Sequence, residues 1–185
     1  NSKRMRELSN KRAIAAMPVA GSFRAIDFAL SNMSNSHVQR VAVLTQYNSR
    51  SLNEHLSSSK WWDFGRKQGG LFVFTPTITK DNSLWYQGTA DAIYQNLNFI
   101  DMMDPEYVLI LSGDHIYTMD YSKMLDVHRA NKADATIGVF EVPWDEAPRF
   151  GIMNTDSVDG RIIEFEEKPA KPKSNLAIPQ CACKQ

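Results

Sequence analysis

Two short polar clusters directly follow apolar runs in this sequence, and one of them contains a carboxylate that could act on phosphates through a bound metal ion. Ser112-Gly113-Asp114-His115 follows the run Tyr107–Leu111, and Thr45-Gln46 follows the run Arg40–Leu44. A carboxylate at the end of a buried strand can bind Mg²⁺, because this ion keeps several waters and takes its other ligands from substrate phosphates. Asp114 could equally cap a following helix, so its position fits a metal ligand and a structural residue equally well.

A third cluster lies at the start of a segment with strong helical periodicity. Gly88-Thr89-Ala90-Asp91 precedes apolar residues that recur at helical spacing, namely Ile93, Leu97 and Ile100. Small residues at a helix start let a planar base or a phosphate approach the backbone, and the free N–H groups of the first turn favour anions. Taken by itself, the cluster is better explained as an ordinary helix start than as a ligand site, with Thr89 as the cap and Asp91 in the first turn.

The charged cluster Glu166-Glu167-Lys168-Pro169 could bind a sugar phosphate. A carboxylate accepts hydrogen bonds from hydroxyl groups, and an ammonium group pairs with a phosphate. An exposed charge cluster is the more common role of such a run. The same holds for the basic residues near the start of the chain, Lys3, Arg4 and Arg6, unless an anion lies beside them.

Alternating helices and strands must position these clusters. Apolar residues at helical spacing predict helices, and short runs rich in β-branched residues predict strands. In chain order, the expected elements are a helix at Ala25–Asn35, a strand at Arg40–Leu44, a helix at Ser49–Leu56, a loop and then a strand within Trp61–Thr79, a helix at Thr89–Met103, a strand at Tyr107–Leu111, a helix at Tyr121–Asn131, a strand at Ala135–Val142, and a hairpin of Phe150–Met153 and Arg161–Phe165 with its turn at Asp159-Gly160.

This alternation predicts a three-layer α/β domain with a mainly parallel central sheet. Tyr107–Leu111 is apolar without alternation, which is typical of a strand buried on both faces. Parallel sheets of this kind bind ligands beyond the carboxyl ends of their strands. We therefore expect the strands at 40–44 and 107–111 to be neighbours or near-neighbours, with Gln46 and Asp114 at the same edge of the sheet.

The composition excludes several classes of protein. The chain has 185 residues, with 21 Lys plus Arg and 21 Asp plus Glu, so its formal net charge is zero. This argues against general binding to nucleic acid or anionic membranes, and no run approaches the roughly 18 apolar residues of a membrane span. Both cysteines, Cys181 and Cys183, lie near the C-terminal end, which suits inert thiols in a reducing, cytoplasmic compartment. The motifs G-x-x-x-x-G-K-[ST], G-x-G-x-x-G and G-x-S-x-G are absent.

Six sequence blocks occur in a distinctive order. They are Arg24-Ala25-Ile26-Asp27-Phe28-Ala29-Leu30-Ser31-Asn32, Leu44-Thr45-Gln46-Tyr47, Trp85-Tyr86-Gln87-Gly88-Thr89-Ala90-Asp91-Ala92, Ser112-Gly113-Asp114-His115-Ile116-Tyr117, Arg149-Phe150-Gly151-Ile152-Met153 and Phe165-Glu166-Glu167-Lys168-Pro169. This ordered set resembles the glucose-1-phosphate adenylyltransferase (ADP-glucose pyrophosphorylase) family, in its bacterial glycogen-synthesis form. The resemblance extends from about Arg4 to Ala177, and its third and fourth blocks separate it from the uridylyl- and thymidylyltransferases.

The resemblance implies a GT-A-like, Rossmann-type nucleotidyltransferase domain over residues 1–177, incomplete at both ends, with residues 178–185 outside the family pattern. It also implies transfer of AMP from ATP to glucose 1-phosphate with Mg²⁺ as cofactor. The products would be pyrophosphate and the ADP-glucose used for glycogen synthesis in the cytoplasm. The resemblance further implies a homo- or heterotetramer, with no nucleic-acid or membrane partner.

The same resemblance implies roles for individual residues. Arg4 and Asp114 would be catalytic: Arg4 would stabilise the departing pyrophosphate, and Asp114 would hold the Mg²⁺. The adenine end of ATP would be surrounded by Gln46, Gly88, Thr89 and Ala90. Glucose 1-phosphate would be held by Tyr86, Gly151, Glu167 and Lys168.

The chain departs from the family pattern at two positions close to the expected phosphate loop. Ser2 stands where the family has a loop glycine, and Ile14 stands where it has a phosphate-contacting lysine. Three interpretations stay open. The chain is part of the catalytic domain of an adenylyltransferase, a regulatory subunit that binds nucleotide or sugar phosphate without turnover, or a truncated fragment without activity. The departures at Ser2 and Ile14 favour a regulatory subunit or an inactive fragment. The presence of Tyr86, Asp114 and Lys168 indicates that the chain descends from an active adenylyltransferase.

Overall fold

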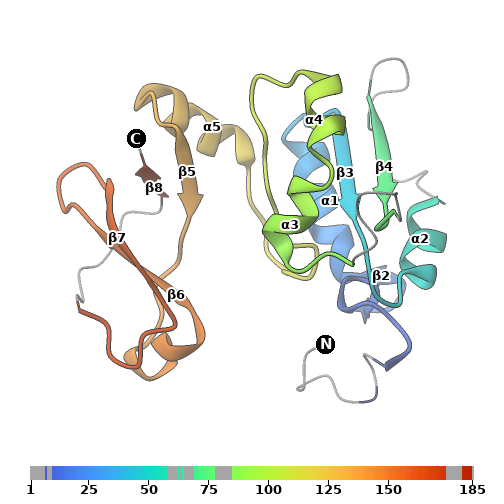
Figure 1. The fold of residues 1–185 in the computed structure, drawn as a ribbon, viewed down its shortest axis with the longest axis horizontal. Helices are drawn as coiled ribbons and strands as arrows, with labels where there is room; N and C mark the ends of the chain where they lie inside the picture. Colours follow the sequence, from blue (N-terminus) through green and yellow to red (C-terminus); the bar gives the residue numbers. More distant parts are fainter. Residues whose placement is uncertain are drawn as a thin grey trace. The chain divides into compact units, whose positions relative to one another are not determined.

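The computed structural model describes residues 7, 10–57, 62, 64, 69–77, 85–173 and 181–184. The chain divides into two compact units, Asn1–Met119 and Asp120–Gln185. Figure 1 shows the helices and strands of both units, coloured along the sequence. Within the described ranges, no helix is both long and apolar enough to cross a membrane.

The first unit contains the parallel strands. Its described elements, in chain order, are η2 (Ile14–Ala16), β1 (Pro18–Val19), β2 (Phe23–Arg24), α1 (Ala25–Asn35), β3 (Arg40–Leu44), α2 (Arg50–Ser57), β4 (Gly70–Phe74), α3 (Thr89–Tyr94) and α4 (Leu97–Met103). The predicted helix at 25–35 and strand at 40–44 are confirmed with the same bounds, as α1 and β3. The next predicted helix is confirmed as α2, shifted by one residue, and the strand expected within 61–79 is β4.

Helix α1 forms because its apolar residues share one face and a carboxylate closes its first turn. Ile26, Ala29 and Leu30 are all buried, at the spacing of a single helical face. The Asp27 carboxylate accepts a hydrogen bond of 2.9 Å from the backbone N–H of Arg24, which satisfies a donor at the helix start. Leu30 is completely buried, so α1 lies at the centre of the core.

Strands β3 and β4 form a two-stranded parallel sheet, and Figure 1 shows them side by side. The register runs from Arg40 opposite Gly70 to Leu44 opposite Phe74. Parallel strands cannot be joined by a tight turn, and here α2 lies between them in the sequence. The loops that follow the two strands therefore emerge at the same end of this sheet.

Helices lie on both faces of the β3–β4 sheet, so the three layers of the prediction are confirmed. On one face, Val41 belongs to the same buried cluster as Leu30 of α1 and Leu52 of α2. On the other face, the ring of Phe72 lies 5.0 Å from the ring of Phe99 of α4. The alternation of side chains along each strand sends neighbouring residues to these two helical layers.

The apolar run Tyr107–Leu111 does not form the strand that its sequence predicts. Among the described residues it has no strand partner, and the partner of β3 is β4. Val108 is 53% exposed and Ile110 is 66% exposed, so the run is not buried on both faces. Apolar and β-branched residues favour a strand only where a hydrogen-bonded neighbour and a packed face are available. The prediction that 107–111 is a strand beside 40–44 is therefore wrong.

The single helix predicted at Thr89–Met103 is divided into α3 and α4 at Asn96. Asn96 Nδ2 donates a hydrogen bond of 2.8 Å to the carbonyl of Ala92, four residues earlier. The side chain thereby takes a carbonyl that a backbone N–H would occupy in a continuous helix. The backbone N–H of Asn96 bonds to Ile93 instead, at 3.0 Å, and the helix is interrupted.

The second unit consists of one helix, short strands and a hairpin in its described part. Its elements are α5 (Tyr121–Ala130), β5 (Ala135–Gly138), η3 (Trp144–Arg149), β6 (Gly151–Thr155), β7 (Ile162–Glu167) and β8 (Cys181–Lys184). The predicted helix at 121–131 is confirmed as α5, and the strand predicted at 135–142 is shorter, ending at Gly138. β5 pairs with β8 in an antiparallel ladder, which the sequence analysis did not predict.

The predicted hairpin is confirmed as the antiparallel pair β6–β7, in which Gly151 lies opposite Glu167. Its turn lies at the predicted Asp159-Gly160, where Gly160 adopts a φ of 72° that favours glycine. The backbone N–H of Arg161 donates to Asp159 Oδ1 at 2.9 Å. This hydrogen bond is the main cause that lowers the pKa of the Asp159 carboxyl below its usual value. The turn thus reverses the chain between β6 and β7, whose register shifts between Asn154 and Thr155.

Candidate functional site

Asp114 presents an exposed carboxylate in a short turn of the first unit. Ser112 Oγ donates a hydrogen bond of 2.6 Å to Asp114 Oδ1, and His115 Nε2 lies 3.9 Å from the same oxygen. Among the described residues no contact is formed by Oδ2, so this oxygen could hold an ion that needs few protein ligands. In the part of the chain that the structure describes, no three His, Cys, Asp or Glu side chains gather as a metal site.

The backbone on either side of Asp114 is fixed against α1. A Cβ at Gly113 would lie 3.7 Å from Ile26, so this part of the turn is in ordinary packing contact with the core. Three residues after Asp114, the carbonyl of Tyr117 accepts a hydrogen bond of 2.9 Å from Asn32 Nδ2. Asp114 is therefore positioned by contacts of its neighbours with α1. The strand that the sequence predicted directly before Asp114 does not form.

A stacked pair of aromatic rings connects the loop of Gln46 to the segment before α3. Gln46 is half-buried in the loop after β3, and its neighbour Tyr47 stacks on Trp85. The ring centroids are 5.3 Å apart and the ring planes are inclined by 4°. Both rings are largely exposed, so the contact between them joins two surface loops that are distant in sequence.

Gly88, Thr89 and Ala90 are exposed where α3 begins. A Cβ at Gly88 would meet nothing within 4 Å, so a ligand has room to approach the backbone there. Thr89 is not the helix cap that the sequence predicts, because Gly88 occupies that position. Instead, Asp91 Oδ2 closes the turn by accepting the backbone N–H of Gln87 at 2.8 Å.

Tyr86 is buried beside the junction of α3 and α4. Its hydroxyl oxygen accepts a hydrogen bond of 3.1 Å from Asn96 Nδ2. A phenolic hydroxyl that accepts one hydrogen bond keeps its own proton to donate. Among the described residues, no acceptor for the Tyr86 hydroxyl proton is recorded, so a ligand could accept it.

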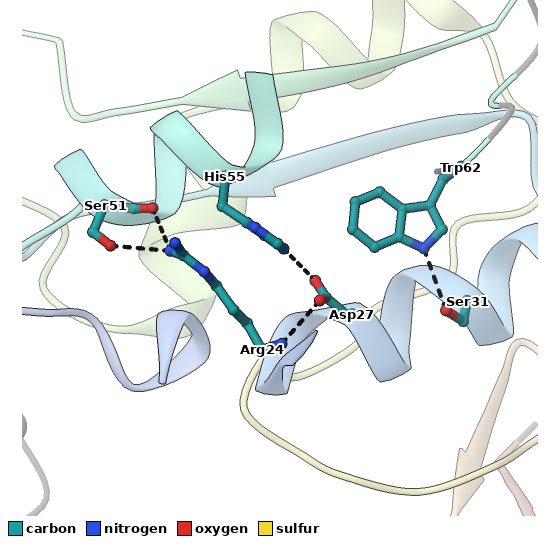
Figure 2. A network of polar contacts seen from close by, with 6 residues as sticks. All are labelled: Arg24, Asp27, Ser31, Ser51, His55 and Trp62. Carbon is teal, nitrogen blue, oxygen red and sulfur yellow. Dashed lines mark hydrogen bonds and ion pairs between the residues drawn. The ribbon is translucent and has the colours of Figure 1, made fainter. Parts of the chain in front are cut away.

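A buried polar network joins α1 to α2, and sequence reasoning missed it (Figure 2). His55 Nε2 of α2 lies 2.6 Å from Asp27 Oδ1 of α1, and Asp27 is only 6% exposed. Arg24 Nη1 donates to both the carbonyl oxygen and Oγ of Ser51, at 2.5 and 3.0 Å. Two turns of α2 are thereby attached to the start of α1.

The same network continues to Trp62. The His55 ring meets the Trp62 ring edge-on, with centroids 5.9 Å apart, and Trp62 Nε1 donates to Ser31 Oγ at 3.3 Å. Figure 2 shows Trp62 above Ser31 of α1, beside the Asp27 carboxylate. Because α2 begins just after the Gln46 loop, these contacts also limit how far that loop can move.

Three of the four residues expected to bind the sugar phosphate lie together at the end of the hairpin away from its turn. Gly151 opens β6 opposite Glu167 of β7, and Lys168 follows directly. The Lys168 backbone N–H donates to the carbonyl of Phe150 at 3.1 Å, and its Nζ pairs with the Glu167 carboxylate. The cluster offers an ammonium group for a phosphate and a carboxylate for hydroxyl groups.

Two residues from the resemblance, Arg4 and Ser2, lie outside the described residues. Ile14 is described and is half-buried at the start of η2. Its apolar side chain supplies no charge at the position where the family pattern has a lysine.

Comparison with known proteins decides the family of the chain. The sequence matches the nucleotidyl transferase family over residues 1–179. The chain belongs to that family. It is 54% identical to the glucose-1-phosphate adenylyltransferase of Clostridium novyi (strain NT) over 174 residues, which are 94% of this chain and 45% of that protein.

Two further relatives of this nucleotidyl transferase carry the same name. The protein from Clostridium acetobutylicum is 57% identical over 170 residues, covering 92% of this chain and 44% of the relative. The protein from Geobacillus stearothermophilus is 52% identical over 174 residues, covering 94% of this chain and 45% of the relative. The chain thus spans less than half the length of these relatives. The resemblance and the nucleotidyltransferase fold class expected from the sequence are confirmed.

Replacing Gly151 with alanine in this nucleotidyl transferase should disturb the hairpin end. A Cβ at this position would lie 2.6 Å from Cε2 of Phe165, so the ring must move or the strands must separate. Overpacking of this kind costs about 1–3 kcal/mol. We expect faster backbone hydrogen exchange at Glu167 and Lys168 in Gly151→Ala. Exchange equal to that of the unmodified protein would show that Phe165 does not constrain this position, and Gly138→Ala, which meets nothing within 4 Å, is the control.

Proposed function

We propose that the chain is part of the catalytic domain of a glucose-1-phosphate adenylyltransferase. The observation that carries the proposal is 52–57% identity to proteins of that name over 92–94% of the chain. The grouping of Gly151, Glu167 and Lys168 supports it independently, because an ammonium group beside a carboxylate suits a sugar phosphate.

In the proposed reaction, a phosphate oxygen of glucose 1-phosphate attacks the α-phosphorus of ATP. The bond from that phosphorus to the oxygen that bridges to the β-phosphate breaks, and pyrophosphate leaves with the electron pair. Little covalent chemistry falls to the protein, which must align the two substrates and neutralise their charge. Arg4 is proposed to act on the departing pyrophosphate, and Gln46, Gly88, Thr89 and Ala90 on the adenine end.

Asp114 is proposed to hold the Mg²⁺ through Oδ2, since Oδ1 is engaged by Ser112. Mg²⁺ at this place would supply positive charge to the substrate phosphates. The exposure of the Asp114 side chain leaves space for the waters and phosphate oxygens that complete such a site. The hydrogen bond from Ser112 orients the carboxylate before any ligand arrives.

Glucose 1-phosphate is proposed to replace an existing contact at the hairpin end. The Lys168 ammonium now pairs with Glu167, and both side chains are exposed. A phosphate would take the ammonium group, which frees Glu167 to accept hydrogen bonds from sugar hydroxyls. Gly151 would contact the sugar through its backbone, because the Phe165 ring occupies the space where its side chain would lie. Tyr86 would donate its hydroxyl proton. We further propose that the full-length protein is a tetramer.

Lys168→Gln in the full-length protein should raise the KM for glucose 1-phosphate about 10-fold or more, because a hydrogen-bonded charge on the phosphate is lost. The KM for ATP should change little, the pattern of lost binding to one substrate. Initial rates of ADP-glucose formation at varied concentrations of each substrate measure both values. Lys171→Gln, in the same exposed loop, is the control for loss of a positive charge.

Equal effects of Lys168→Gln on both substrates would contradict this assignment. The alternative function is a regulatory subunit, which the uncharged Ile14 favours. A full-length protein that binds ATP or glucose 1-phosphate but forms no ADP-glucose would support that alternative over the catalytic one.

A further inference from the structure

The chain reverses direction at Lys168 in a conformation that its sequence disfavours. Lys168 has a φ of 46°, in the left-handed region that residues with a side chain seldom adopt. It also precedes Pro169, and the residue before a proline is mainly restricted to extended backbone. A conformation with two such penalties persists only where surrounding contacts impose it.

The segment after Pro169 returns along β7 and is tied to it by Lys173. The Lys173 ammonium pairs with the Glu164 carboxylate, and its backbone N–H donates to Glu166 Oε1 at 3.3 Å. Asn154 Nδ2 of the opposite strand donates to the same oxygen at 2.9 Å. Glu166 is thus fixed from one side by the hairpin and from the other by the returning segment.

The contacts of Lys173 lie on the face of β7 opposite to the candidate binding residue Glu167. Side chains alternate along a strand, so Glu164 and Glu166 share one face while Phe165 and Glu167 share the other. The contacts of Lys173 therefore do not compete with a ligand at Glu167. They act on the backbone that carries Lys168 instead.

We propose that Lys173, Glu164 and Glu166 form a strap that holds Lys168 in its left-handed conformation, which makes them positioning residues for the sugar phosphate. This inference rests on the proposed function, in which Lys168 binds the phosphate. The strap fixes the direction from which the Lys168 side chain leaves the backbone, before any substrate is bound.

The ion pair in the strap is charged around neutral pH and sensitive to salt. Its hydrogen bond is the main cause that lowers the pKa of Glu164 and raises the pKa of Lys173. Because the folded pKa of Glu164 is lowered, the pair is lost only as the pH falls through that value. Both side chains are exposed, so salt weakens their attraction.

Lys173→Met in the full-length protein tests the strap, because methionine keeps the length and loses the charge. We expect the KM for glucose 1-phosphate to rise about two- to fivefold, the scale of an exposed ion pair. The kcat and the KM for ATP should stay unchanged, and the rise should shrink at high salt. Lys173→Arg should restore the original value, and Lys171→Met should have no effect.

The double variant Lys173→Met, Glu164→Gln identifies the partner. If the two residues act only through their pair, the double variant should have the same KM as either single variant. If the increases in the KM for glucose 1-phosphate of the two single variants add up in the double variant, the proposed pairing is wrong. A loss of kcat in Lys173→Met together with an equal rise in both KM values would indicate general damage to the unit and would also overturn the positioning role.

The failure of the strap and the failure of the proposed function give different results. If Lys168→Gln raises the KM for glucose 1-phosphate while Lys173→Met does not, the strap is wrong and the proposed function stands. If no ADP-glucose forms at all, backbone hydrogen exchange without substrate still tests the strap. Faster exchange at the Lys168 amide in Lys173→Met supports it, and unchanged exchange overturns it.

Discussion

Asp114→Asn in the full-length protein should lower kcat for ADP-glucose formation by about 100-fold or more, the cost of removing a major charge-stabilising group. Asparagine keeps an oxygen that can accept from Ser112, so the turn should hold its shape. What the variant loses is the negative charge proposed to hold Mg²⁺. The rate should be measured over a wide range of Mg²⁺ concentration, with thermal unfolding as the check on the fold.

Asp101→Asn is the matched control for Asp114→Asn, since Asp101 is an exposed carboxylate of α4 in the same unit. It should leave both the rate and its dependence on Mg²⁺ unchanged. A near-normal rate of Asp114→Asn at saturating Mg²⁺ would remove Asp114 from the proposed metal site.

Asp27→Ala should lower the free energy of unfolding by about 3–5 kcal/mol, because it removes one partner of a buried pair. His55 would lose the carboxylate 2.6 Å away, and the Arg24 backbone N–H would lose its acceptor. Urea unfolding of the full-length Asp27→Ala variant and of the unmodified full-length protein measures this loss. It should appear as a lower urea midpoint of the first unfolding transition.

Helix α2 provides a matched control for this second prediction. Arg50 and Glu54 form an ion pair on the same helix at 3.1 Å, but their side chains are 93% and 66% exposed. Breaking an exposed pair of this spacing costs about 0.3–0.5 kcal/mol. If Asp27→Ala costs no more than Glu54→Gln, the buried network does not hold α1 and α2 together.

The elements that the sequence predicted well are those whose signal is local. The stripe of Ile26, Leu30 and Met33 gives the bounds of α1, and the Asp159-Gly160 turn gives the position of the hairpin. Local hydrogen bonding and side-chain periodicity contain enough information for these features. The pairing of Gly151 with Glu167 does not follow from the turn alone, because the register of the two strands shifts between Asn154 and Thr155.

The elements predicted less well depend on partners that are distant in sequence. The run 107–111 has strand-like residues but no described strand beside it, and the helix break at Asn96 depends on one side-chain hydrogen bond. The Asp27–His55 contact joins residues 28 positions apart. One signal was available: His55 falls on the same helical face as the buried Leu52 and Leu56, where an unpartnered histidine would be unfavourable.

The hairpin that carries Gly151 and Glu167 also differs from the rest of its unit in the order of assembly. Its opening pair lies sixteen residues apart along the chain, whereas β5 pairs with residues more than forty positions later. A hairpin closes within about 1–10 μs once both strands exist, and longer loops close later because they lose more entropy. During folding, β6 and β7 can therefore pair before β5 meets β8. The proposed sugar-phosphate end would then form before the β5–β8 pair.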